Sequence, residues 1–104
     1  MKTLILVRHA KSAWPDISMP DYERPLDTQG VEDSNQMGKY LKTKVLSPDY
    51  IITSGAKRTL ETAQIISKEL FNQPIILNIN KFNYFSRGFK IYPMINIIIN
   101  NSST

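Results

Sequence analysis

Three short apolar runs alternate with two segments of helical periodicity over the first 79 residues of this 104-residue chain. The runs at residues 4–7, 50–53 and 74–79 have the length and the aliphatic content of buried strands. Strands that alternate with helices form parallel sheets, because each helix carries the chain back across the sheet. The pattern therefore predicts a β-α-β-α-β order in one small α/β domain.

The two helical segments have recognisable starts and apolar faces. We expect the first helix to span about Gly30 to Lys44, with Asp27 or Thr28 as its N-cap. Its residues that we expect to face the sheet are Val31, Leu41 and Val45. In the second segment an apolar face is formed by Leu60, Ala63, Ile66 and Leu70, which recur at helical spacing.

The first predicted strand ends in the only histidine of the chain. Leu4 to Val7 is apolar at every position, which predicts burial on both faces of the sheet. Arg8 and His9 follow at the carboxyl end, where open α/β sheets place their ligands. Arg8 could bind two oxygens of a phosphoryl group, and His9 could attack phosphorus or move a proton. A histidine at a strand end is also commonly a hydrogen-bonded core or surface residue, so the pair alone leaves both interpretations open.

A second arginine lies at the start of the second predicted helix. Ser54 and Gly55 end the preceding strand and can cap this helix. Arg58 then falls in the first turn, beside backbone N–H groups that have no helical partner. A cation at this end of a helix is unfavourable by itself, which predicts an anionic partner. The alternative is a solvated surface arginine.

Together, these segments resemble the histidine phosphatase superfamily, the phosphoglycerate-mutase-like proteins. The chain has Arg8-His9-Ala10 where the family has Arg-His-Gly or Arg-His-Ala. Ser54 to Ala63 is similar to the family's Ser-x-x-x-Arg-Thr-x-x-Thr-Ala segment, and Arg24 to Gly30 to its Arg-Pro-Leu-Thr-x-x-Gly segment. Lys11 to Trp14 resembles the small phosphohistidine phosphatases of the SixA type. The resemblance covers about residues 1–77.

The resemblance implies a three-layer, parallel-sheet phosphoglycerate-mutase-like fold and a phosphatase activity. His9 would be the nucleophile that accepts the phosphoryl group, and Arg8 and Arg58 would bind its oxygens and offset charge in the transition state. Ser12 would be a further phosphate-binding residue, or would simply cap a turn. The implied substrate is a phosphorylated molecule, above all a protein that bears phosphohistidine. The scheme needs no cofactor and no metal, and one histidine without cysteine does not make an ordinary zinc site.

The chain departs from the family pattern in its second part. Family members carry a second catalytic histidine late in the chain, and this chain has none. The acid that protonates the leaving group is also not identifiable, although Asp16 and Asp21 in the loop after His9 are candidates. We therefore expect the activity to be doubtful. The alternative is a truncated remnant that binds phosphate without chemistry.

Residues 78–104 differ in composition from residues 1–77. They are rich in Asn, Ile, Lys, Phe and Tyr, and no acidic residue follows Glu69. We therefore divide the chain into the N-terminal part of a histidine phosphatase domain and an atypical tail. We expect the reading frame to shift near Leu77 and the fold to be truncated after its third strand. The alternative is a genuine strand at the end of the chain, because Ile95 to Ile99 has strong β propensity.

The net charge of +4 gives little support to a nucleic-acid partner. All nine acids and ten of the thirteen basic residues precede residue 72, so most of the excess comes from the tail. A single-strand binder that uses the tail's aromatic and basic residues is a third alternative, but we expect no nucleic acid. The apolar run before Arg8 is too short for a signal peptide, and the tail is too short and too interrupted to cross a bilayer. We expect a cytoplasmic protein that does not bind membranes.

Overall fold

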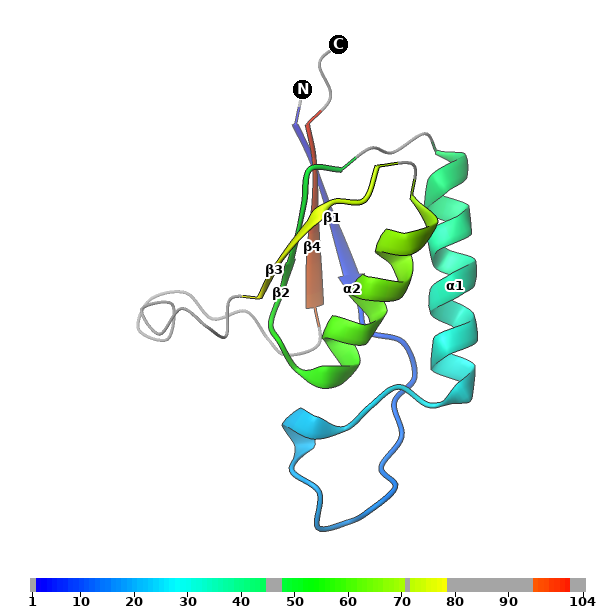
Figure 1. The fold of residues 1–104 in the computed structure, drawn as a ribbon, viewed down its shortest axis with the longest axis vertical. Helices are drawn as coiled ribbons and strands as arrows, with labels where there is room; N and C mark the ends of the chain where they lie inside the picture. Colours follow the sequence, from blue (N-terminus) through cyan, green and yellow to red (C-terminus); the bar gives the residue numbers. More distant parts are fainter. Residues whose placement is uncertain (1, 45–47, 71, 79–94, 102–104) are drawn as a thin grey trace, which may run out of the picture.

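The computed structural model describes residues 2–44, 48–70, 72–78 and 95–101. Its helices are α1 (Thr28–Thr43), α2 (Lys57–Glu69) and the short 3-10 helix η1 (Asp21–Glu23). Its strands are β1 (Lys2–Arg8), β2 (Tyr50–Thr53), β3 (Ile75–Asn78) and β4 (Ile95–Asn101). The four strands form one sheet in the order β1-β4-β2-β3 (Figure 1).

The predicted α/β class is confirmed, and the sheet is mixed in direction. β2 and β3 pair in parallel, whereas β4 lies between β1 and β2 and is antiparallel to both. The strands β1, β2 and β3 therefore share one direction, as the β-α-β-α-β order predicts. The expectation that the sheet ends with the third strand is wrong, because the isoleucine-rich run of β4 fills the centre of the sheet. Ile98 in this run is 1% exposed and pairs with Ile5 and Ile51. The division of the chain at residue 77 and the shifted frame stay predictions.

Helix α1 begins where the capping pattern predicts. The carboxylate of Asp27 accepts a hydrogen bond of 2.7 Å from the backbone N–H of Gly30, which satisfies one of the orphan donors of the first turn. Leu41 is buried, as predicted. Val31 is wrongly predicted to face the sheet, because α1 packs chiefly against α2 and leaves Val31 39% exposed. Val45 lies outside the described residues.

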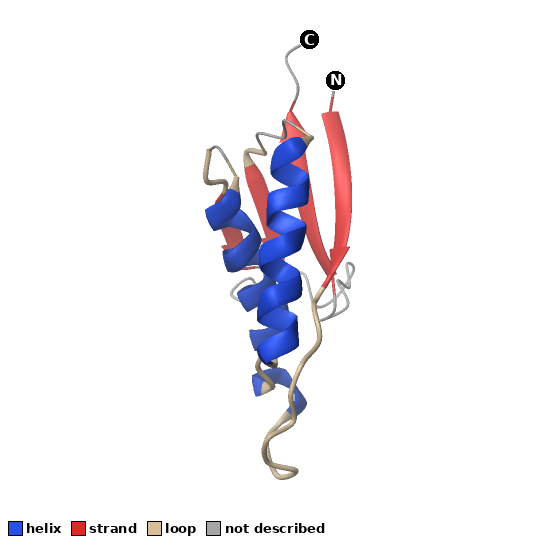
Figure 2. Cartoon of the chain, turned by 90° about the vertical axis from the view of Figure 1, so that its right-hand side faces the viewer, coloured by secondary structure: helices blue, strands red, loops and turns tan. Residues whose placement is uncertain are grey.

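Both helices lie on one side of the sheet, so the described part of the chain has two layers (Figure 2). The core between them is formed by Leu41, Ile51, Ala63, Ile66, Leu70 and Ile98. The side chains of Ile5 and Val7 pack against this core, whereas Leu4 and Leu6 are 66% and 67% exposed. The prediction that this strand is buried on both faces is therefore wrong, because no described helix covers the face that carries Leu4 and Leu6.

Candidate active site

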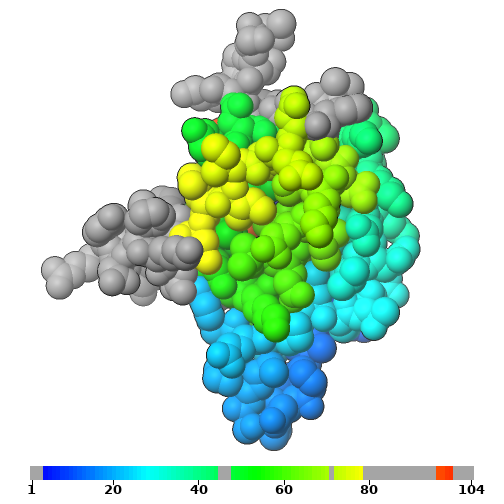
Figure 3. Space-filling view, in the orientation of Figure 1, coloured from blue at the N-terminus to red at the C-terminus, as the bar shows by residue number. Residues whose placement is uncertain are grey.

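The loop between β1 and α1 folds back on itself beyond the carboxyl end of β1. Ser12 forms an isolated antiparallel bridge with Leu26, and the N–H of Asp27 donates to the carbonyl of Lys11. The start of the loop is attached to α2, because the N–H of Ala10 donates to Oγ1 of Thr62 across 3.1 Å. Figure 3 shows the loop projecting from the rest of the molecule. The loop therefore brings η1 to the N-terminus of α2.

The imidazole of His9 is held by contacts at both ring nitrogens. Nδ1 lies 2.6 Å from the carbonyl oxygen of Ala10, and Nε2 lies 3.3 Å from the Nε–H of Arg58. A carbonyl only accepts and a guanidinium only donates, so the neutral ring carries its proton on Nδ1 and its lone pair on Nε2. Partial burial is the main reason that the pKa of His9 is below its usual range, and the nearby Arg58, Arg8 and Arg24 charges add to it. Burial and the nearby arginines therefore favour the neutral ring, whose Nε2 lone pair is the atom that could act chemically.

Arg58 occupies the first turn of α2, as the sequence predicts, and is 6% exposed. The helix begins after Ala56, not after a capping Ser54 or Gly55, and this N-cap makes no side-chain hydrogen bond. The hydroxyl of Ser54 accepts from the N–H of Ala56 across 3.4 Å, while Gly55 makes the turn with a φ of 90°. Arg58 therefore brings a buried positive charge to the positive end of a helix, which is an arrangement that favours an anion.

Asp21 supplies the anionic partner of Arg58 in this structure. Its carboxylate lies 3.0 Å from Nη2 of Arg58, and its backbone carbonyl accepts from Nη1 across 2.8 Å. The same carboxylate also contacts Arg24, at 3.1 Å. These contacts with Arg24 and Arg58 place the pKa of Asp21 below its usual range. Asp16, the other candidate acid, accepts from the backbone and hydroxyl of Ser18 and lies outside this cluster.

Arg24 is a site residue that the sequence reasoning missed. Its Nη2 donates to the hydroxyl of Ser12 across 2.9 Å, and its guanidinium lies 4.4 Å from the ring centroid of Trp14. The contact with Trp14 and the hydrogen bonds hold a second arginine at the carboxylate of Asp21, which also contacts Arg58. The signal was present in the Arg24-Pro25-Leu26 segment, but that segment carried no indication of which side chains it would meet.

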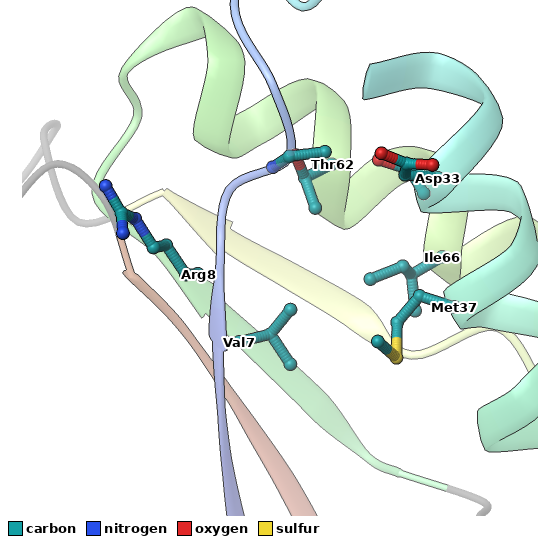
Figure 4. Close-up of a pocket in the computed structure, with 8 residues that line it drawn as sticks. Val7, Arg8, Asp33, Met37, Thr62 and Ile66 are labelled. Atoms are coloured by element: carbon teal, nitrogen blue, oxygen red, sulfur yellow. The ribbon is translucent and has the colours of Figure 1, made fainter. Parts of the chain in front are cut away.

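Arg8 is placed differently from the other predicted residues. It ends β1, is exposed, and its charge lowers the pKa of His9. Figure 4 shows its side chain pointing away from Asp33 and Met37. Those two residues belong to a cavity of about 160 Å³ between β1, α1 and α2. Arg8, Ala10 and Thr62 also line this cavity, whereas His9 and Arg58 do not, so the cavity adjoins the cluster around His9.

The structure therefore brings together His9, Arg58 and Ser12 through Arg24 and Asp21. Among the described residues no three His, Cys, Asp or Glu side chains lie together as metal ligands would. Within the same residues, neither helix has the length and apolarity that crossing a membrane requires.

Comparison with known proteins identifies the segment that contains this cluster. The model of the histidine phosphatase superfamily (branch 1) matches residues 4–79. An uncharacterized chloroplastic protein of Arabidopsis thaliana is 36% identical over 69 residues, which are 66% of this chain and 32% of that protein. The 2,3-bisphosphoglycerate-dependent phosphoglycerate mutase of Bifidobacterium longum is 36% identical over 64 residues, or 60% of this chain and 26% of the mutase.

Solved structures of SixA proteins have a similar fold. One from Agrobacterium tumefaciens is 27% identical, with a TM-score of 0.67 over 81% of this chain and 58% of its own. The protein histidine phosphatase SixA complexed with tungstate is 26% identical, with a TM-score of 0.64 over 75% of this chain and 48% of its own. The chain thus spans about half the length of these structures, and about a third or less of the curated relatives.

Proposed function

We propose that this chain, which belongs to the histidine phosphatase superfamily, hydrolyses a phosphoryl group through a phosphohistidine intermediate on His9. One observation carries the proposal. The contact between Nδ1 and the Ala10 carbonyl leaves the lone pair of the neutral ring on Nε2, and that atom faces the buried guanidinium of Arg58. A nucleophile and a binder of phosphoryl oxygens therefore lie side by side.

The reaction takes place in two steps. In the first, Nε2 of His9 attacks phosphorus, a P–N bond forms, and the bond to the leaving group breaks with the leaving group taking up a proton from solvent. In the second, water attacks phosphorus and gives up a proton to solvent, the P–N bond breaks, and inorganic phosphate leaves. The lone pair of Nε2 is restored, so the enzyme returns to its starting state.

The arginines act by position and charge. The phosphoryl oxygens replace the Asp21 carboxylate on Arg58, so that one anion exchanges for another at the same guanidinium. Arg24, which touches the same carboxylate and Ser12, lies next to the exchanged oxygens. Arg8 adds positive charge from the end of β1. Such fixed donors supply most of the rate enhancement in phosphoryl transfer, because the charge of the transition state is spread over the oxygens.

The proposed substrate is a phosphohistidine side chain of a protein. This choice is supported by the similarity to SixA structures, one of which is described as a protein histidine phosphatase. His9 is half-buried at the start of the loop after β1, close to the exposed residues Arg8 and Lys11, and a phosphorylated side chain of another protein would reach it from that side. The mutase relatives act on phosphoglycerates by name, so a small phosphate ester is the competing substrate class.

A second candidate function is phosphate binding without turnover. It is favoured by the single histidine, because the family pattern has a second one at the phosphoryl group. Loss of a single donor of this kind costs about 10²- to 10³-fold in rate. Arg58, Arg24 and the N-terminus of α2 would still bind the anion.

The test is to mix the purified chain with phosphoramidate or a phosphohistidine peptide and to follow both protein phosphorylation and phosphate release. The proposed function predicts acid-labile phosphate on wild type, none on His9→Asn, and multiple turnovers of released phosphate. Tungstate titration by calorimetry separates the two candidates. Tungstate binding without label or turnover would support the binding function alone. Label that survives His9→Asn would rule out the proposed nucleophile.

A further inference from the structure

One face of the sheet is apolar across all four strands, and no described helix covers it. The core face carries Ile5, Ile51, Ile76 and Ile98, which contact the helices' core. The alternate residues of each strand point to the opposite face. There the exposed side chains include Leu4 at 66%, Leu6 at 67% and Ile75 at 59%.

The strand register organises this face into two complete rows. The first row runs from β1 to β3 through Leu4, Ile99, Tyr50 and Ile75. The second runs parallel to it through Leu6, Ile97, Ile52 and Leu77. We call these eight residues the open face. None of the eight is charged and seven are Leu or Ile, so the sheet presents an apolar surface here, bordered at the end of β1 by the exposed Arg8.

From this surface we propose that the open face packs against the open face of a second copy of the chain, which makes a symmetric dimer. Two sheets can pack face to face about 10 Å apart, with their apolar side chains interdigitated. A two-fold axis requires a patch that is complementary to itself. The open face meets that requirement, because an uncharged surface of similar rows on the partner leaves no charge buried without a counter-charge.

The size of the open face also fits a second copy. The five residues whose exposure is largest, Leu4, Leu6, Tyr50, Ile75 and Leu77, are between 36% and 67% exposed. Together they leave roughly 500 Å² of accessible surface on one chain. Two copies could therefore bury about 1,000 Å², which is near the lower limit of the area that specific interfaces bury. A patch of this kind on a monomer marks an interaction site. We therefore expect a dimer that forms reversibly at about tens of micromolar.

Sedimentation velocity of the wild-type chain at about 5 and 200 µM tests the proposal across that concentration range. Two variants place a charge at opposite ends of the open face, Leu6→Lys on β1 and Ile75→Lys on β3. The matched control is Ile17→Lys, because Ile17 is 93% exposed but lies in the loop after β1. Circular dichroism confirms that each variant is folded.

The proposal expects a dimer at high concentration for wild type and Ile17→Lys, and a monomer for both open-face variants. A wild-type monomer at 200 µM would overturn it, and would mean that the face stays open or is covered by other residues of the chain. A dimer that is lost in Leu6→Lys but kept in Ile75→Lys would overturn it in favour of edge pairing through β1. Aggregates of no defined size in all four proteins would overturn it as well. None of these outcomes depends on the phosphatase activity.

Discussion

The Nε–H group of Arg58 points at Nε2 of His9 across 3.3 Å, from a helix that follows the histidine by about fifty residues. The contact joins a strand end to the first turn of α2, and both positions result from short local signals. It also has a chemical consequence, since a cation that donates to the ring nitrogen opposes protonation of that nitrogen. In the proposed function, Arg58 would thus both bind the phosphoryl group and keep His9 in the neutral form that attacks phosphorus.

The first prediction concerns the pKa of His9, which we expect below the usual 6.5 in the folded chain. If the neutral ring is the nucleophile, as we propose, phosphorylation of His9 should rise with pH through the lowered pKa and be flat above it. Arg58→Ala removes one of the charges that lower the pKa, so the midpoint should shift to higher pH. As the only histidine, His9 gives a single imidazole signal in a proton NMR titration.

The control for this titration is Arg58→Lys, which keeps a positive charge near the ring. The pKa of His9 should therefore stay lower in Arg58→Lys than in Arg58→Ala. Equal midpoints in the wild type and in Arg58→Ala would show that the guanidinium of Arg58 does not act on the ring, and that burial and the other neighbours of His9 set its pKa.

The second prediction concerns Asp21, whose carboxylate forms an ion pair with Arg58. Asp21→Asn removes the negative charge that competes with an anion for this guanidinium. We expect tungstate to bind about two- to five-fold more tightly, which corresponds to the energy of a partly exposed ion pair. Isothermal titration calorimetry measures the change.

Asp16→Asn is the matched control for this effect. It removes the same charge from the same loop, but Asp16 accepts only from Ser18 in its own turn. Tungstate affinity should change little in this variant. If both variants bind tungstate equally tightly, net charge is the cause, and the exchange at Arg58 is not.

The sequence predicted those parts of the fold and of the site that depend on neighbouring residues. The Asp27 cap, the α2 register and the meeting of Arg58 with the end of β1 each rest on short spacings and on the common edge of parallel strands. The contacts of Asp21 and Arg24 could not be predicted in this way, because these residues reach Arg58 and Ser12 only after the loop closes through the Ser12–Leu26 bridge. No periodicity indicates such a closure.

Prediction of the sheet from the sequence pattern has the same limit. Leu4 to Val7 is apolar at every position, and that pattern cannot distinguish a strand covered on both faces from one with a face left open. The position of β4 was also beyond prediction. Its antiparallel pairing with β1 joins residues more than eighty positions apart, and β propensity alone indicates a strand without indicating its neighbours.

The third prediction tests the central position of β4 through Asn96, which is 1% exposed. Its Nδ2 donates to the carbonyl of Thr59 across 2.9 Å, which ties the strand to α2. Asn96→Asp has nearly the same shape but replaces this donor with a buried charge. We expect a loss of about 2–4 kcal/mol in the free energy of unfolding, measured by urea denaturation at neutral pH.

The pH dependence of this loss gives an internal check. Burial raises the pKa of a new carboxyl, so the loss should be full at neutral pH and should shrink below about pH 4, where the unfolded chain is also protonated. Gln64→Glu on the exposed side of α2 is the control and should change stability little. A stable Asn96→Asp chain at neutral pH would contradict the placement of β4.

The last prediction concerns Gly30, where α1 approaches the loop that carries Ser12. A Cβ at this position would overlap the carbonyl oxygen of Lys11, which accepts the N–H of Asp27 across 2.9 Å. The loop cannot move away without losing that hydrogen bond. Gly30→Ala should therefore cost about 1–3 kcal/mol in the free energy of unfolding, even though alanine is the better helix former.

Gly38→Ala separates the effect on the loop from the effect on stability. Its Cβ would come within 2.9 Å of the Glu69 side chain, between α1 and α2, so this variant should also lower stability in urea. Only Gly30→Ala displaces the Lys11–Ser12 segment, and with it the hydroxyl that Arg24 contacts. We expect tungstate affinity to fall several-fold in Gly30→Ala and to be kept in Gly38→Ala, when both are titrated under conditions where they are folded. Equal affinities would mean that the loop's attachment to α1 does not set the geometry around Arg24 and Arg58.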